Sequence, residues 1–258
     1  MSARAPWFGK VVDAHGHLGG WFNFLVPETG TGSFLAEMDR CGVRMAGVSH
    51  LLAVGPDALE GNRLMAEEVR RHPDRLFGYA VVNPWQPASL SQARELLAEP
   101  GIRGLKLHPD THAYPLDGPS YNAAFGLAAE HQVPVLSHSQ GDSSYAAPER
   151  FGVVARRHPG VTLLMGHSGL WPDAYPRAVQ VAAEHPNVVL ELSGGRMSGA
   201  WVARFVAEVG ADRVMYGSDA IFLDLRYGLG RVALAPLDEE QREFVLFRNL
   251  LRVLGERP

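Results

Sequence analysis

The stretch from Val133 to Ser168, VPVLSHSQGDSSYAAPERFGVVARRHPGVTLLMGHS, places two short apolar runs on either side of an amphipathic segment. The runs Val133–Ser137 and Val161–Gly166 are too short for helices and too apolar for strands that face solvent, so they predict strands buried on both faces, as in a parallel sheet. The segment Pro148–His158 has helical spacing and stops before Pro159, which disfavours continuation of a helix. Together the three segments predict a strand–helix–strand unit.

The same alternation extends in both directions along the chain. Six further apolar runs predict strands at Val11–Ala14, Val43–Ser49, Phe77–Val82, Gly104–Leu107, Val188–Leu192 and Val214–Gly217. Amphipathic stretches predict helices at Gly61–His72, Ser89–Glu99, Asn122–His131, Ala174–His185, Ala200–Val209 and Glu239–Leu254.

Eight strand–helix units without a Pro/Ser-rich linker predict one α/β domain over residues 1–258, a TIM (β/α)8 barrel. The length of 258 residues agrees with this fold, which typically takes roughly 250 residues. An open, doubly wound sheet would share the alternation. It would also favour a G-x-G-x-x-G loop after an early strand, and Gly16, Gly19 and Gly20 do not form one.

Composition excludes several classes of protein. With 46% hydrophobic and 20% charged residues, the chain is not disordered or fibrous. A net charge of −4 offers no basic surface for nucleic acid. The sequence has neither a signal-peptide pattern nor an apolar stretch of the ~18 residues that span a membrane, and the single Cys41 cannot form an internal disulfide. We therefore expect a cytoplasmic protein with a small-molecule substrate and no nucleic-acid or membrane partner; a homodimer is left open.

The 11 histidines divide by position. His72, His131, His158 and His185 lie at predicted helix ends, where an imidazole can bond free carbonyl groups. His112 lies in a loop and is undecided. The other six follow predicted strands: His15, His17, His50, His108, His138 and His167. Since the carboxyl ends of barrel strands form the mouth where active sites lie, these six predict a functional site.

His15-Gly16-His17 is the most specific local motif. Residues i and i+2 of a strand share a face, so both imidazoles point the same way and form half a site for Zn²⁺, Fe²⁺ or Mn²⁺. Asp219 ends the last apolar run, where a buried carboxylate needs a partner such as a metal. A helix N-cap at Ser218 or Asp219 is the alternative.

Segments spread along the chain resemble motifs of the amidohydrolase superfamily. The resemblance is to the amidohydrolase-2 branch, which includes the aminocarboxymuconate-semialdehyde-decarboxylase-like enzymes. The motifs that carry the resemblance are Asp13–His17, Gly104–Pro109, Tyr114–Asp117, Val133–His138, Met165–Gly169, Tyr216–Asp219 and Arg248–Leu254.

The resemblance implies one divalent metal ion per chain. Its ligands would be His15, His17, His138 and Asp219, and Zn²⁺ is the favoured ion, with Mn or Fe as alternatives. The catalytic residues would be His167, which would activate or orient the attacking water, and Asp219, which would share the handling of protons with it.

Four residues are predicted to contact substrate. Lys106 is one of only two lysines, and a buried Lys can lose its charge where Arg cannot. It would bind a substrate carboxylate or oxyanion; an ion pair, or a carboxylated lysine that bridges two metals, are alternatives. His108 shares its face. Trp21 lies in the long segment Leu18–Gly32, and Arg196 follows the seventh strand.

The main functional hypothesis is a metal-dependent hydrolase that uses a metal-activated water on a small amide, lactone or ester. A non-oxidative decarboxylase of an unsaturated or aromatic carboxylic acid is the first alternative, because the same metal and histidines would serve it. A TatD-like metal-dependent nuclease is a second, disfavoured because Lys106 stands where that class would carry Glu. An inactive metal-binding barrel is the third.

Overall fold

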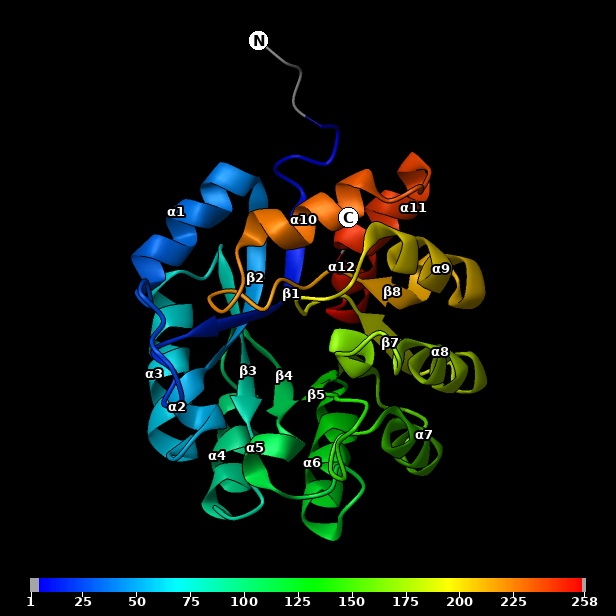
Figure 1. Cartoon of the computed structure of the whole chain (residues 1–258). Helices are drawn as coiled ribbons and strands as arrows, with labels where there is room; N and C mark the ends of the chain where they lie inside the picture. The colour runs from blue at the N-terminus through cyan, green and yellow to red at the C-terminus, as the bar shows by residue number, and fades with distance from the viewer. Residues whose placement is uncertain (1–4, 257–258) are drawn as a thin grey trace.

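Eight parallel strands follow one another around a barrel in the order of the sequence, and helices surround them (Figure 1). The computed structural model describes residues 5–256, so residues 1–4 and 257–258 of the predicted domain lie outside the described part. The strands are β1 (Val11–Leu18), β2 (Val43–His50), β3 (Leu76–Val81), β4 (Ile102–Leu107), β5 (Val135–His138), β6 (Leu163–Gly166), β7 (Val188–Glu191) and β8 (Val214–Met215).

The barrel closes between β1 and the segment that follows β8. Gly16 forms a parallel bridge with Ala220. The Asp219 amide donates to the His15 carbonyl at 2.8 Å, and the Ala14 amide donates to the Tyr216 carbonyl at 3.1 Å. Because the ring is complete, the carboxyl ends of all eight strands meet at one mouth. The predicted single-domain TIM barrel is confirmed.

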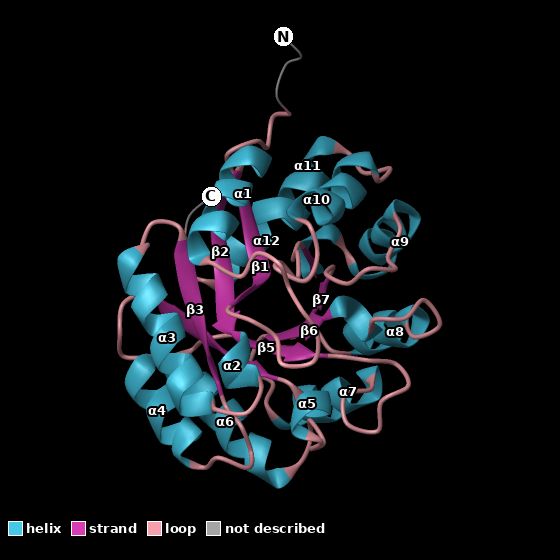
Figure 2. Cartoon of the chain, turned by 60° about the vertical axis from the view of Figure 1, so that its left-hand side comes forward, coloured by secondary structure: helices cyan, strands magenta, loops and turns pink. Residues whose placement is uncertain are grey.

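Helices form the outer layer, as Figure 2 shows by the cyan ribbons around the magenta strands. The α-helices are α1 (Thr31–Cys41), α2 (Leu51–Val54), α3 (Ala58–Arg71), α4 (Ala88–Leu96), α5 (Pro109–His112), α6 (Pro119–His131), α7 (Pro148–Arg157), α8 (Tyr175–Glu184), α9 (Gly199–Val209), α10 (Leu225–Leu234), α11 (Glu239–Glu243) and α12 (Asn249–Val253). Three short segments of other helical type are η1 (His167–Gly169), η2 (Ala211–Arg213) and η3 (Phe244–Arg248).

Four of these α-helices, α1, α2, α5 and α10, lie outside the predicted helix ranges. Helix α1 begins at Thr31 after Gly30, which has no side chain to cap the helix. Helix α10 contains Gly228 and Gly230, which weaken its helical signal because glycine is a poor helix former. The predicted helix Glu239–Leu254 is one helical run whose middle, η3, is π-helical.

The apolar strands are buried between the barrel interior and the helices. Every residue of β3, β5, β6 and β7 is buried, as expected for strands covered on both faces. One continuous cluster of buried side chains runs from Val11 to Leu254. In the described part of the chain, no helix is both long enough and apolar enough to cross a membrane.

Candidate active site

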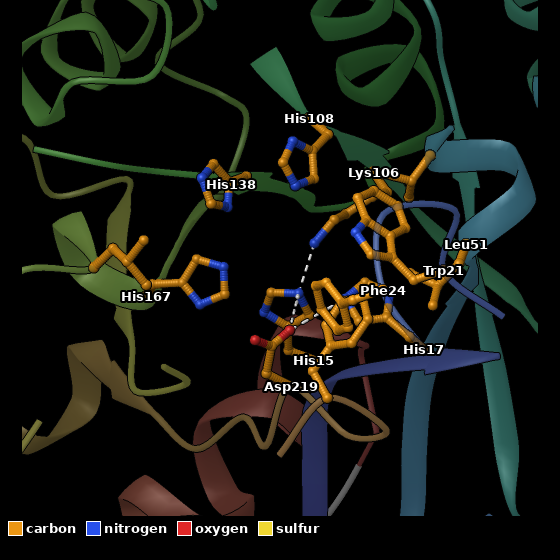
Figure 3. A pocket seen from close by; sticks show the side chains of 13 residues that line it. His15, His17, Trp21, Phe24, Leu51, Lys106, His108, His138, His167 and Asp219 are labelled. Carbon is orange, nitrogen blue, oxygen red and sulfur yellow. Dashed lines mark hydrogen bonds and ion pairs between the residues drawn. The ribbon is translucent and has the colours of Figure 1, made fainter. Parts of the chain in front are cut away.

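A cavity of about 270 Å³ opens at the carboxyl ends of the strands (Figure 3). Its polar side chains are His15, His17, Lys106, His108, His138, His167 and Asp219. Its apolar side chains are Trp21, Phe24, Leu51, Val54, Leu170 and Phe222. Of the residues predicted to bind metal, act in catalysis or contact substrate, the structure brings together all except Arg196; of the six histidines that follow strands, His50 lies outside the cavity.

Strand β1 presents His15 and His17 to this cavity. The two buried rings have their centroids 5.0 Å apart. Gly16 stands between them, where an added Cβ would lie 3.1 Å from the Phe34 ring and 3.3 Å from the Gly47 carbonyl oxygen. A larger residue would push β1 away from its neighbours, so glycine allows the two imidazoles to share one end of the strand.

Asp219 meets both imidazoles from the segment after β8. Its Oδ1 lies 3.3 Å from His17 Nε2 and 3.7 Å from His15 Nε2. The backbone of Asp219 has φ +61°, a left-handed conformation that is uncommon outside glycine and clusters at functional sites. The hydrogen bond from the Asp219 backbone amide to the His15 carbonyl holds the Asp219 backbone in this conformation.

These three side chains have the chemistry of a metal site. Their ligand atoms all lie within 4.8 Å of one another. Burial lowers the pKa of His15 and of His17, which keeps the imidazoles neutral and able to bind a metal. Burial alone would raise the pKa of Asp219, but His167 and His17 outweigh it, so that pKa lies below its ordinary value. Two neutral imidazoles and one carboxylate fit a divalent ion.

A second group of possible metal ligands, His15, His167 and Glu191, lies behind the first. Glu191, at the end of β7, is fully buried and already has four donors. Its Oε1 accepts from the Ser193 amide at 2.6 Å. Its Oε2 accepts from His15 Nδ1 at 3.0 Å, the His167 amide at 3.0 Å and Ser193 Oγ at 2.6 Å. Four donors use most of the acceptor capacity of an ionised carboxylate, although burial raises the pKa of Glu191.

The hydrogen bonds of His15 decide between the two groups. A neutral imidazole has one N–H donor and one acceptor nitrogen. Because His15 Nδ1 donates to Glu191, His15 Nε2 carries the lone pair that faces Asp219 and the cavity. The structure thus favours His15, His17 and Asp219 as the candidate metal site. Glu191 would orient the His15 ring through its hydrogen bond to Nδ1.

His167 belongs to the second group of possible ligands and also lines the cavity. Its backbone has φ +65°, and its ring lies 5.0 Å from that of His15. Its Nδ1 lies 2.7 Å from Ser193 Oγ, whose only hydrogen is directed at Glu191. His167 Nδ1 is therefore the donor to Ser193, and its Nε2 is left as a proton acceptor on the cavity side.

Asp13 ties β1 to the segment that carries Asp219. Its Oδ1 accepts from the His15 amide at 3.0 Å and from the Ser218 amide at 2.9 Å. Burial raises the pKa of Asp13 to about 7, against the effect of these hydrogen bonds. The sequence did not single out Asp13, Glu191 or Ser193 as site residues.

Lys106 extends from β4 into the centre of the polar group. It is fully buried, and its Nζ lies 2.6 Å from His15 Nε2. Burial lowers the pKa of Lys106 to about 8, while Asp219 and Glu191 partly offset the shift. One lone pair on His15 cannot accept from Lys106 and bind a metal at once. A metal at His15 would therefore release the Lys106 amine for another partner.

His138 and His108 form the wall opposite His15. Their rings stack with centroids 4.2 Å apart. His138 Nε2 lies 3.3 Å from Asp110 Oδ2, yet neither atom has a hydrogen-bond partner within the described part of the chain. His108 Nδ1 accepts from the Thr111 amide at 3.2 Å. His138 is not part of the group of His15, His17 and Asp219, whose ligand atoms lie close together. Its role as a ligand therefore stays a prediction.

Aromatic side chains cover the side of the cavity next to His17. Trp21 and Phe24 come from the segment between β1 and α1, and Phe222 follows Asp219. The ring of Phe222 lies 5.4 Å from that of His17, 5.5 Å from that of Phe24 and 5.7 Å from that of Trp21. The predicted contact of Trp21 with the site therefore has a structural basis.

Two sequence candidates, Arg196 and His50, lie outside the cavity lining, as does Arg226. Arg196 stacks over the Trp171 ring at 4.3 Å, outside the lining of the cavity. Arg226 pairs with Asp224 at the surface. His50 caps α2 by accepting from the Leu52 amide.

Comparison with known proteins adds a family and a set of relatives. Residues 12–255 match a family model described as amidohydrolase. The chain is 21% identical over 237 residues to the gamma-resorcylate decarboxylase of Rhodococcus jostii (strain RHA1), and the alignment covers 72% of each chain.

Solved structures share the fold. The 5-carboxyvanillate decarboxylase of Sphingomonas paucimobilis superposes with a TM-score of 0.75 at 17% identity, over 96% of this chain and 99% of that one. A dihydroxybenzoic acid decarboxylase from Polaromonas sp. JS666, with bound manganese and an inhibitor, gives a TM-score of 0.72 at 17% identity, over 95% of this chain and 96% of that one.

Proposed function

This chain belongs to the amidohydrolase family, and we propose that it is a metal-dependent enzyme that removes CO₂ without oxidation from an aromatic carboxylic acid. The observation that carries the proposal is the composition of the cavity. The polar side chains of the cavity, which include the buried Lys106 and which we call its polar floor, adjoin a wall of three aromatic side chains, Trp21, Phe24 and Phe222. Named relatives of similar sequence and fold are decarboxylases of ring carboxylic acids, which supports this alternative over the hydrolase hypothesis.

Each part of the cavity has a task in this reaction. Trp21, Phe24 and Phe222 would hold the flat ring by stacking and edge contacts. The Lys106 amine, released from His15, would hold an oxygen of the substrate carboxylate. A divalent ion would be held by His15, His17 and Asp219, with His138 beside them, and when bound there it supplies Lewis-acid polarisation of a substrate oxygen.

The reaction consumes one proton. The ring carbon that carries the carboxylate gains a proton, the bond to the carboxyl carbon breaks, and its electron pair stays on the ring carbon as CO₂ leaves. Besides His15, Asp219 and His167 have lone pairs on the cavity side. We assign them to holding and delivering this proton. The low-polarity wall next to them excludes water from the reacting carbon.

Product analysis tests the proposal. Protein loaded with Mn²⁺ or Zn²⁺ would be incubated with aromatic acids, lactones, esters and amides in ¹⁸O-labelled water. We expect CO₂ and the decarboxylated ring in equal amounts, with no ¹⁸O in the ring product. A product that carries ¹⁸O, formed without CO₂, would instead establish hydrolysis.

The two lysines provide a matched pair of variants. Lys106→Met removes the buried amine, and we expect at least a hundredfold loss of CO₂ release, since one stabilising donor at a reacting oxygen is worth about 10²–10³ in rate. Lys10→Met changes a lysine paired with Glu243, outside the cavity lining, and leaves the rate unchanged. Equal rates for the two variants would remove Lys106 from the reaction.

A further inference from the structure

The cavity beyond its polar floor is apolar throughout. Its six remaining lining side chains are Trp21, Phe24, Leu51, Val54, Leu170 and Phe222. None of them offers a charge, and only the Trp21 indole N–H is a donor. They come from four different connecting segments, which makes the apolar character a property of the whole wall.

Positive charge in the cavity is limited to one residue besides the histidines. Among its lining residues Lys106 is the one Lys or Arg, and it lies on the floor beside His15. Arg196 and Arg226 lie outside the lining and have other partners, the Trp171 ring and Asp224. Apart from the divalent ion of the proposed function, a substrate carboxylate held by Lys106 therefore uses the one cationic Lys or Arg of the lining.

The size of the cavity suits a substrate with a single ring. A cavity of about 150 Å³ lined by aliphatic and aromatic side chains holds one benzene molecule. The cavity here has about 270 Å³, which leaves room for one ring, its carboxylate and a small substituent.

We infer that the substrate is a monocyclic acid with one carboxylate, whose ring is unsubstituted or carries alkyl groups where it meets the wall. This inference rests on the proposed function and specifies its substrate class. A second carboxylate would be buried against the wall without a cation, and a hydroxyl without a partner, and both are costly. An alkyl group gains from burial on the same wall.

Binding measurements separate this inference from the reaction itself. Titration calorimetry on the Mn²⁺-loaded full chain would compare 4-methylbenzoate, 4-hydroxybenzoate and terephthalate, three acids that differ at one ring position, and chromatography would verify that each stays intact. We expect 4-methylbenzoate to bind at least tenfold more tightly than terephthalate, with 4-hydroxybenzoate between them; an unpaired buried polar group costs about fivefold to a hundredfold in affinity, and a charged one costs more. Equal or tighter binding of terephthalate, or no binding of any of the three, overturns the inference.

Two adjacent loop positions provide a matched test of the wall. Phe24 lines the cavity and is 56% exposed, and Leu25 is 88% exposed and lies outside the lining. Phe24→Arg adds a cation to the wall, and we expect it to shift the affinity ratio toward terephthalate at least tenfold. Leu25→Arg adds the same charge one residue further on and leaves the ratio unchanged. Equal ratios in the two variants overturn the inference.

The two proposals fail in different ways. If the acids bind in the expected order and no aromatic acid in the panel releases CO₂, the decarboxylase proposal is wrong and the ligand class stands. If CO₂ is released fastest from acids that carry a second carboxylate or a hydroxyl at the 4-position, the reaction stands and the inferred substrate class is wrong.

Discussion

His15 faces two groups of residues with its two ring nitrogens. Nδ1 donates to Glu191, and Nε2 points to Asp219 and to Lys106. The first bond fixes which nitrogen keeps its lone pair, and this choice decides whether a metal can bind on the cavity side. Glu191 thus acts through His15 and is a positioning residue.

The Glu191→Gln variant tests this role. An amide can donate to His15 Nδ1 and reverse its tautomer, so we expect the affinity for Mn²⁺ to fall about 10–100-fold, the usual cost of losing such a partner. Competition with a chelator would measure the affinity, and circular dichroism would verify folding. Glu184→Gln changes an exposed glutamate on α8 and serves as the control. An unaltered affinity in a folded Glu191→Gln protein would contradict the role.

His112 gives a prediction about pH and stability. Its neutral ring is fully bonded, because Nε2 donates to the Val54 carbonyl at 3.1 Å and Nδ1 accepts from the Tyr121 hydroxyl at 2.6 Å. Burial lowers its pKa to about 4, below the ordinary 6.5. Between these values the unfolded chain binds a proton that the native ring does not, so stability falls as pH decreases from 6.5 to 4 and this contribution is then constant.

Urea unfolding at pH 7 and pH 5, in the presence of a chelator, measures this contribution. The free energy of unfolding of the wild type should fall by about 2 kcal/mol more than that of His112→Gln, which does not titrate in this range. Other buried histidines affect both proteins alike. Parallel losses in the two proteins would show that His112 is not held neutral.

Sequence reasoning named His15, His17 and Asp219, which the structure brings together, and missed the residues behind them. Asp219 drew notice as a carboxylate at the end of an apolar run. The same rule applies to Glu191 in the run Val188–Leu192, and it would have identified this residue too. The bond from Glu191 to His15 spans 176 positions in the sequence, and only the closed barrel reveals it.

At the scale of elements, α2 and α3 pack so closely that one glycine separates them. A Cβ on Gly61 would lie 2.1 Å from the Ala53 amide nitrogen, a backbone atom that cannot move aside. Gly126 lies within α6 and has open space around its Cβ position. The two helical glycines therefore serve different purposes.

Alanine substitutions should separate the two glycines. Gly61→Ala should lower the free energy of unfolding by about 1–3 kcal/mol or more, the range for overpacking. Gly126→Ala should raise it by roughly 0.4–1 kcal/mol, since alanine favours helix and limits the unfolded chain. Chemical denaturation gives both values. Stabilisation by both substitutions would argue against the close contact of α2 with α3.

Strands were the more predictable elements because each is a short apolar run that the barrel buries on both faces. The strand Val135–His138 begins two residues after the start of the predicted run Val133–Ser137 and ends one residue beyond it. Helices were less predictable where their contacts are tertiary. Helix α10 packs against α1 and α9 despite its two glycines, and the sequence of α10 alone does not show those partners.

At the scale of the molecule, metal binding and stability are linked. The candidate ligands come from β1 and from the segment after β8, so an ion between them would bridge the seam at which the barrel closes. An ion that binds only the native state adds about 2.7 kcal/mol at a hundredfold excess over its dissociation constant.

Thermal unfolding with Mn²⁺ tests this link. At that excess we expect Tm to rise by roughly 5–10 °C for a chain of this size. The rise should vanish with a chelator and in the variant Asp219→Asn. An equal rise in Asp219→Asn would place the ion elsewhere in the protein.

The cavity draws its polar and apolar residues from different parts of the barrel. The histidines and Lys106 stand on or directly after strands that neighbours hold on both sides, and Trp21 and Phe24 stand on a connection that lies outside the sheet. Exchange of residues 19–30 for the corresponding connection of another barrel would thus leave the candidate metal ligands and the side chains proposed to move the proton in place. Such a graft is a practical route to an enzyme with the same chemistry and a new choice of acid.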